Sequence, residues 1–131
     1  MHPRVQELMT YLDAQRAGVM AAAGGVAVER WMERPAPGAW SVTEVLEHLR
    51  RSEEGVVRLV FKLGKQERAS SSPRLETETS SVLGALDHMF GGRGIIDRTM
   101  RREAPPGFRP DGAVDPTTIV NGLARTRADL C

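Results

Sequence analysis

A histidine with carboxylates near it in the sequence is the part of the chain best suited to chemistry. Neutral imidazole is a common ligand of zinc, nickel and iron ions, so His48 is the candidate metal ligand. Glu53 lies further along the same predicted helix, and we expect its carboxylate to approach the imidazole as a hydrogen-bond acceptor. We interpret Glu44 as a helix-capping residue and Glu47 as a solvated side chain.

The other residues that could react or bind a metal are weaker candidates. His88 lies on a separate short helical piece, and we interpret it as a solvated or core-edge histidine. Cys131 is the single cysteine; the sequence identifies no base that could activate it, and we reject it as a nucleophile. His2 receives no role. A mononuclear metal site needs three or four protein ligands, which His48 alone does not supply.

The residues just before the candidate ligand specify a helix entry. Ser41 is a good N-cap, and Glu44 three residues later completes a capping box. Trp40 precedes the cap and Val45 lies at the fourth helical position, which is the spacing of a hydrophobic staple. We therefore expect a helix to begin directly after the cap, with Trp40 packed in the core and setting the entry angle.

The stretch from Trp40 to Leu49, WSVTEVLEHL, followed by Glu53, resembles the second-helix signature of the DinB-like four-helix-bundle proteins, also described as DinB/YfiT-like metalloenzymes. The resemblance is sharp over residues 35–54 and looser, but consistent in order and spacing, over residues 1–131. It implies one all-α domain, an up-and-down helical bundle that spans residues 1–131. It also implies a divalent metal held by three histidines, one of which matches His48.

The sequence departs from this family pattern towards its end. The other two family histidines lie close together on a final helix, and no such pair is present. Asp115 as cap and Pro116 at the first position open the last predicted helix, which would be the third of four. It shows no stop signal, so we expect the fourth helix to be missing and the chain to be truncated. We therefore expect zinc or nickel to bind weakly or not at all.

Apolar residues at helical spacing predict the elements that would position these residues. The pattern places long helices at residues 3–23, 42–66 and 116–130. A polar loop rich in serine and threonine covers residues 67–81, and short helical pieces follow at residues 82–102. A short helical turn is also expected in the connection that precedes the second long helix. No strand pattern is present, so the fold class is all-α.

The apolar stripe of the second long helix is interrupted where Ser52, Glu53 and Gly55 fall near its line. Polar residues at these positions could line an internal site, or could form a turn of helix that faces solvent. Gly55 costs helix stability, about 1 kcal/mol relative to alanine. We expect it to permit the close approach of a neighbouring segment or a ligand.

The composition argues against several classes of partner. The chain has 131 residues, 40% of them hydrophobic and 27% charged, which is ordinary for one soluble domain. Its net charge of +1 gives no electrostatic reason to expect nucleic acid or an anionic membrane as partner. The single cysteine and the lack of an apolar leader or membrane-length segment predict a soluble cytoplasmic protein.

Functions from two different classes remain open. The resemblance implies a metal-dependent transferase or hydrolase, which in some relatives uses a low-molecular-weight thiol, so the substrate would be a small molecule or a thiol. The alternative is a non-catalytic helical binding or stress-response module that has lost the metal, or an incomplete gene product. The sequence leaves open whether the chain is an enzyme.

The apolar stripes of the three long helices would leave one face of the bundle uncovered. Exposed apolar patches beyond a few hundred Å² usually mark interfaces. We therefore expect this face to form a homodimer, or the fold to be only marginally stable, unless the short pieces at residues 82–102 close the gap.

Overall fold

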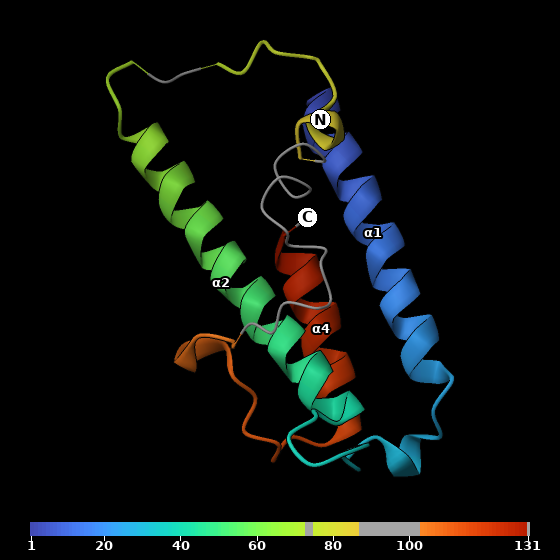
Figure 1. The fold of residues 1–131 in the computed structure, drawn as a ribbon. Helices are drawn as coiled ribbons and strands as arrows, with labels where there is room; N and C mark the ends of the chain where they lie inside the picture. The colour runs from blue at the N-terminus through green and yellow to red at the C-terminus, as the bar shows by residue number, and fades with distance from the viewer. Residues whose placement is uncertain (73–74, 87–102, 131) are drawn as a thin grey trace. The chain divides into compact units, whose positions relative to one another are not determined.

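The computed structural model describes residues 1–72, 75–86 and 103–130. Within these ranges the chain is all-α, as predicted, and contains no strand (Figure 1). Residues 82–86 form a further helical turn. In chain order the other elements are α1 (Pro3–Gly24), the 3₁₀ turn η1 (Val28–Arg30), α2 (Val42–Arg68), the 3₁₀ turn η2 (Pro106–Phe108) and α4 (Pro116–Leu130).

The long helices agree with the predicted ranges to within two residues at each end. The short turn expected before the second long helix is η1. His88 and Cys131 lie outside the described residues. None of the helices in the described ranges combines the length and the apolar character that a membrane crossing requires.

One compact unit combines residues 1–21 with residues 75–103. In this unit the carboxylate of Glu7 accepts hydrogen bonds from the Ser81 hydroxyl at 2.6 Å and the Val82 amide at 2.8 Å. The Ser81 hydroxyl is the main reason that the pKa of Glu7 lies below its usual range, and the Val82 amide adds to the effect. Glu7 therefore supplies an acceptor to the start of the 82–86 turn.

The second compact unit combines residues 22–74 with residues 104–131, and its main packing contact is between α2 and α4. Three apolar side chains at this contact are at most 1% exposed, which makes them the centre of the unit. Full burial of each such side chain contributes about 1.5–3 kcal/mol. These side chains are Leu46 of α2 and Ile119 and Leu123 of α4.

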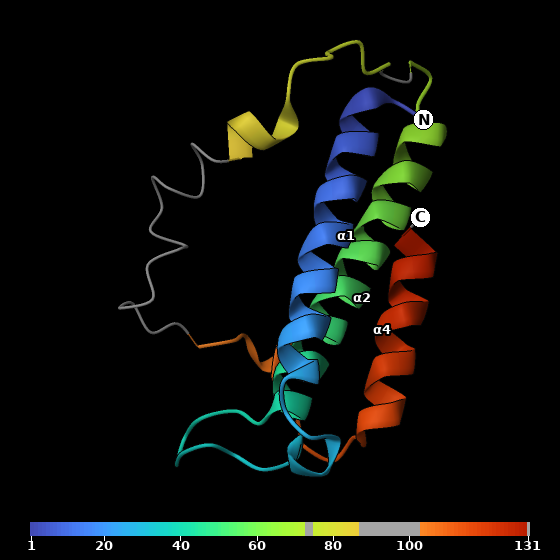
Figure 2. The same cartoon turned by 90° about the vertical axis from the view of Figure 1, so that its right-hand side faces the viewer.

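α2 and α4 run in the same direction, as Figures 1 and 2 show. Near their beginnings Arg50 of α2 crosses Gly122 of α4, where an added Cβ would come within 2.5 Å of Arg50 Cδ. Further along, the Thr126 hydroxyl donates to Glu53 Oε2 at 2.8 Å. Alternate helices of an up-and-down bundle run parallel. α4 (Pro116–Leu130) therefore takes the fourth position of such a bundle, and the expectation that it is the third of four helices is wrong.

The entry to α2 has the predicted capping box. Ser41 Oγ accepts from the Glu44 amide at 3.1 Å, and Glu44 Oε1 accepts from the Ser41 amide at 3.1 Å. Arg34 binds the same carboxylate through Nε at 2.9 Å and Nη2 at 2.8 Å. The Arg34 guanidinium, together with the Ser41 amide, holds the pKa of Glu44 below its usual range. Glu44 is thus a capping residue, as predicted.

The tryptophan that packs beneath this entry is Trp31 and not Trp40. Trp40 is 36% exposed, so the expectation that it packs in the core is wrong. Trp31 is 7% exposed, and its Nε1 donates to the carbonyls of Ala23 and Val26 at 3.2 and 3.0 Å. Its own carbonyl accepts from the amide and the hydroxyl of Thr43, both at 3.0 Å. Trp31 therefore joins the end of α1 to the first turn of α2.

α4 begins with the predicted Asp–Pro pair. Asp115 Oδ1 accepts from the Thr118 amide at 3.0 Å, and Oδ2 accepts from the Thr118 hydroxyl at 2.6 Å. These bonds, the hydroxyl first, hold the pKa of Asp115 below its usual range. Pro116 fills the first helical position, where its missing N–H would have had no helical partner.

Candidate functional site

A backbone carbonyl from a distant segment fixes the imidazole of His48. His48 Nδ1 lies 2.8 Å from the carbonyl oxygen of Phe108, which is 60 residues away in the sequence. Because a carbonyl can only accept, we assign the proton of the neutral ring to Nδ1, and Nε2 then presents its lone pair. His48 is half-buried, and the indole of Trp40 lies beside it.

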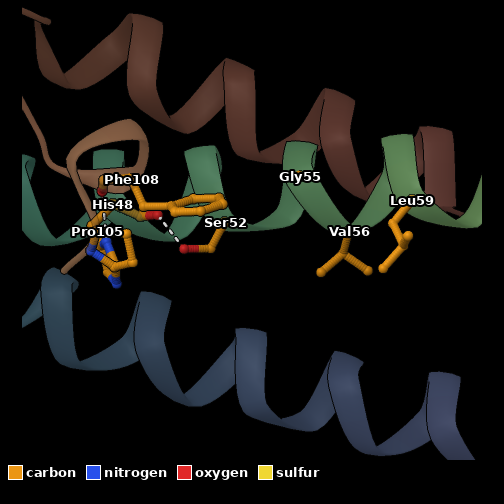
Figure 3. A pocket seen from close by; sticks show the side chains of 7 residues that line it. All are labelled: His48, Ser52, Gly55, Val56, Leu59, Pro105 and Phe108. Atoms are coloured by element: carbon orange, nitrogen blue, oxygen red, sulfur yellow. Dashed lines mark hydrogen bonds between the residues drawn. The ribbon is translucent and has the colours of Figure 1, made fainter.

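His48 stands at one end of an open groove of about 400 Å³ along α2 (Figure 3). The Ser52 hydroxyl in this groove donates to the backbone carbonyl of His48 at 2.8 Å, so its proton is already used within α2. Nearly all of the remaining lining is apolar, and His48 is the ionisable side chain of the groove. Figure 3 shows Pro105 close to His48, Phe108 and Ser52 next, and Val56 and Leu59 towards the other end.

Gly55 allows a neighbouring segment to approach α2, as predicted. A Cβ at this position would lie 2.9 Å from Cε1 and 3.3 Å from Cζ of Phe108, closer than ordinary packing permits. The Phe108 ring therefore rests directly on the helix backbone. Ser52 and Gly55, which interrupt the apolar stripe of α2, both line this open groove, whereas Glu53 does not.

Glu47 is fully buried, and the expectation of a solvated side chain is wrong. Its Oε1 accepts from Arg51 Nε at 3.1 Å and Nη2 at 2.8 Å, one helical turn away. The backbone amides of Asp111 and Gly112 donate to its two carboxylate oxygens, each at 3.4 Å. A buried carboxylate is costly unless it is paired and hydrogen-bonded, and these four donors supply that compensation.

Residues 105–112 form a crossing segment that lies over the first half of α2. At Phe108 the backbone carbonyl accepts from His48 and the ring covers Gly55. At Asp111 the backbone amide donates to the carboxylate of Glu47. Arg51 Nη2 also pairs with Asp111 Oδ2 at 3.2 Å. The candidate site is thus built from two parts of the chain that are distant in the sequence.

Glu53 faces α4, and the expectation that it approaches His48 is wrong. Its carboxylate accepts from the Thr126 hydroxyl at 2.8 Å and from Arg127 Nη2 at 3.2 Å. The acceptor for His48 is the Phe108 carbonyl instead. Glu53 therefore stabilises the contact between the two parallel helices, and its position on α2 turns it away from the groove.

Sequence reasoning did not find the crossing segment. Pro105 and Phe108 lie in a connection that the sequence predicts only as extended, and no local pattern ties them to a helix 60 residues earlier. The one usable signal is Gly55, which indicates that some segment approaches α2 but does not say which.

The described residues do not fit a complete metal site. Across residues 1–72, 75–86 and 103–130, no group of three or more histidine, cysteine, aspartate or glutamate side chains is arranged to hold an ion. His48 Nδ1 donates to a backbone carbonyl, as the non-ligating nitrogen of a metal-bound histidine commonly does. The groove lining, however, includes no other histidine and no cysteine, aspartate or glutamate. We therefore derive no reaction step through a metal.

The fold and the site define an all-helical protein in which an early histidine of one long helix faces a groove. In a comparison with known protein families, the sequence model of the DinB superfamily matches residues 11–131 of this chain. The chain belongs to the DinB superfamily. No match was found among curated proteins or among solved structures.

Proposed function

We propose that this DinB-superfamily domain binds a small, mostly apolar molecule in the His48 groove, with the imidazole as its polar anchor. The observation that carries the proposal is the bond from His48 Nδ1 to the Phe108 carbonyl at 2.8 Å. With Nδ1 occupied, the neutral ring offers Nε2 as an acceptor. A ligand with a hydroxyl, thiol or N–H group at one end would satisfy it.

The lining of the groove supports this ligand class. Val56 and Leu59 are 50% and 53% exposed, and a ligand lying along α2 would cover them. Ligand sites commonly combine an apolar lining with a few polar groups that set orientation. The groove also carries no side chain that would favour a highly charged ligand.

A matched pair of fluorescent probes tests the proposal. 2-Naphthol has a hydroxyl donor on an apolar ring system, whereas 2-methoxynaphthalene has the same rings without the donor. A net hydrogen bond contributes about 0.5–1.5 kcal/mol, so 2-naphthol should bind about 2- to 12-fold more tightly. His48→Ala should abolish this difference, and His2→Ala, which changes a histidine outside the groove, should preserve it. Equal binding of the two probes, no binding, or a difference that survives in His48→Ala would overturn the proposal.

A metal-dependent transferase or hydrolase is the second candidate function. It is favoured by the same Nδ1–carbonyl bond, because ligating histidines usually donate their other N–H in this way. Calorimetric titration with zinc and with nickel separates the two candidates. One-to-one metal binding that is lost in His48→Ala would favour the second. Weak binding that does not depend on His48 would count against it.

A further inference from the structure

The buried carboxylate of Glu47 and the imidazole of His48 are adjacent on α2, and both are attached to the crossing segment. His48 Nδ1 donates to the Phe108 carbonyl, while the Glu47 carboxylate accepts from the backbone amides of Asp111 and Gly112. We propose that Glu47 is a positioning residue, which acts through the crossing segment to fix the tautomer and orientation of His48.

Glu47 binds a distant segment of the chain as well as its own helix. Its bond with Arg51 is local, but its two backbone donors come from residues 64 and 65 positions further along the chain. Gly112 adopts a positive φ of 75°, which lets the chain turn at the point where it meets the carboxylate. The side chain is 0% exposed, so water does not compete for these donors.

The two attachment points of the crossing segment lie close together in the sequence. Only Arg109 and Pro110 separate Phe108 from Asp111, and proline restricts the backbone of this link. A displacement at the Glu47 end would therefore be transmitted to the Phe108 carbonyl. Phe108 cannot shift independently towards α2, because its ring already rests on Gly55.

The contact with Phe108 determines which ring nitrogen of His48 carries the proton. In water, the neutral histidine side chain favours the tautomer with the proton on Nε2. The Phe108 carbonyl reverses this preference by accepting from Nδ1, and so presents the Nε2 lone pair as an acceptor. If the crossing segment is released, the ring regains its ordinary preference and Nε2 becomes a donor. The tautomer of His48 affects ligand binding only if the groove binds the ligand class proposed above, with a hydroxyl, thiol or N–H donor at one end.

Imidazole ¹⁵N spectra of the ligand-free protein test the proposal, recorded at a pH at which the spectra show neutral rings. In the wild type, His48 should show a protonated Nδ1 and an unprotonated Nε2. Glu47→Gln keeps the shape of the side chain but removes its charge and one acceptor oxygen. It should move both shifts of His48 towards those of a free histidine. Glu54→Gln removes another carboxylate of α2, one that pairs with Arg50, and should leave the His48 signals unchanged.

A purely structural role of Glu47 would lower the melting temperature and leave the tautomer of the folded protein unchanged, and that result would overturn the proposal. If Glu47→Gln does not fold, Glu47→Asp replaces it, because the shorter side chain draws the carboxylate away from the Asp111 and Gly112 amides while keeping its charge. It should shift the His48 signals in the same direction, and unchanged signals would again overturn the proposal.

The two proposals fail in different ways. A tautomer that depends on Glu47, without any preference for 2-naphthol, would disprove the proposed ligand class and leave the positioning role standing. A preference for 2-naphthol with a tautomer that ignores Glu47 would do the reverse. If both are right, Glu47→Gln should also reduce the 2-naphthol preference, by up to the same 2- to 12-fold factor.

Discussion

The indole of Trp40 lies against the imidazole of His48, with ring centroids 5.1 Å apart and ring planes inclined at 51°. This distance lies within the range in which aromatic pairs attract each other. Trp40 immediately precedes the helix cap Ser41, so the residue that was expected to fix the entry of α2 in the core instead joins that entry to the candidate site.

The two tryptophans should differ in their contribution to stability. Trp31→Ala removes a buried side chain together with two hydrogen bonds from its indole N–H, and should cost about 3–5 kcal/mol. Trp40→Ala removes a side chain that is one-third exposed and should cost clearly less. Denaturant midpoints of the two variants measure this difference. A larger loss for Trp40→Ala would contradict the burial described above.

The N-cap of α2 should contribute to stability independently of ligand binding. Ser41→Ala removes the acceptor of the Glu44 amide in a position that is only 2% exposed, and should cost about 1–2 kcal/mol. Ser71→Ala, in the exposed loop after α2, provides the matched control and should change the unfolding free energy by less than about 0.5 kcal/mol. Equal effects in urea unfolding would show that the cap is unimportant.

The Arg34–Glu44 pair should make stability fall as the solution becomes acidic. The pKa of Glu44 is lower in the folded protein than the ordinary value of about 4.3. The unfolded chain therefore binds a proton first, and the stabilisation, fully present above the ordinary pKa, is lost as the pH falls through the folded pKa. Glu44→Gln retains a capping-box residue without the charge, so its stability should decline less steeply between about pH 5 and pH 3. Parallel declines in both proteins would contradict the assignment.

Two glycines of α2 should respond differently to alanine. At Gly64 the nearest atom to an added Cβ is Arg68 Nη1 at 3.5 Å, so Gly64→Ala should raise stability by about 0.5–1 kcal/mol through helix propensity alone. Gly55→Ala gains the same propensity but displaces the Phe108 ring, and should be less stable than Gly64→Ala by at least about 1 kcal/mol. Thermal unfolding of both variants measures the difference. An equally stabilising Gly55→Ala would show that the crossing segment packs loosely.

Local signals explain which features could be predicted from the sequence. The capping box of Ser41 and Glu44 and the Asp115–Pro116 start of α4 depend on residues within one turn of each other, and both are confirmed. Helix bounds follow from the same short-range patterns. The expected homodimer, the single domain over residues 1–131 and the metal affinity stay predictions.

The two carboxylates that sequence reasoning misplaced, Glu47 and Glu53, both depend on segments distant in the chain. Glu47 looks like a solvated carboxylate because its donors Asp111 and Gly112 arrive from more than 60 residues away. Glu53 faces α4 and not the groove, because Thr126 and Arg127 lie on the neighbouring parallel helix. A helical pattern shows which residues share a face, but it does not show which segment will cover that face.

The parallel packing of α2 and α4 brings the positive ends of two helix dipoles to the same end of the unit, as Figures 1 and 2 show. Aligned dipoles repel each other unless negative charge lies near their N-termini. This end of the unit carries Glu44 in the first turn of α2 and Asp115 directly before α4. These carboxylates therefore offset an electrostatic cost that the parallel arrangement itself creates. None of these carboxylates lines the His48 groove.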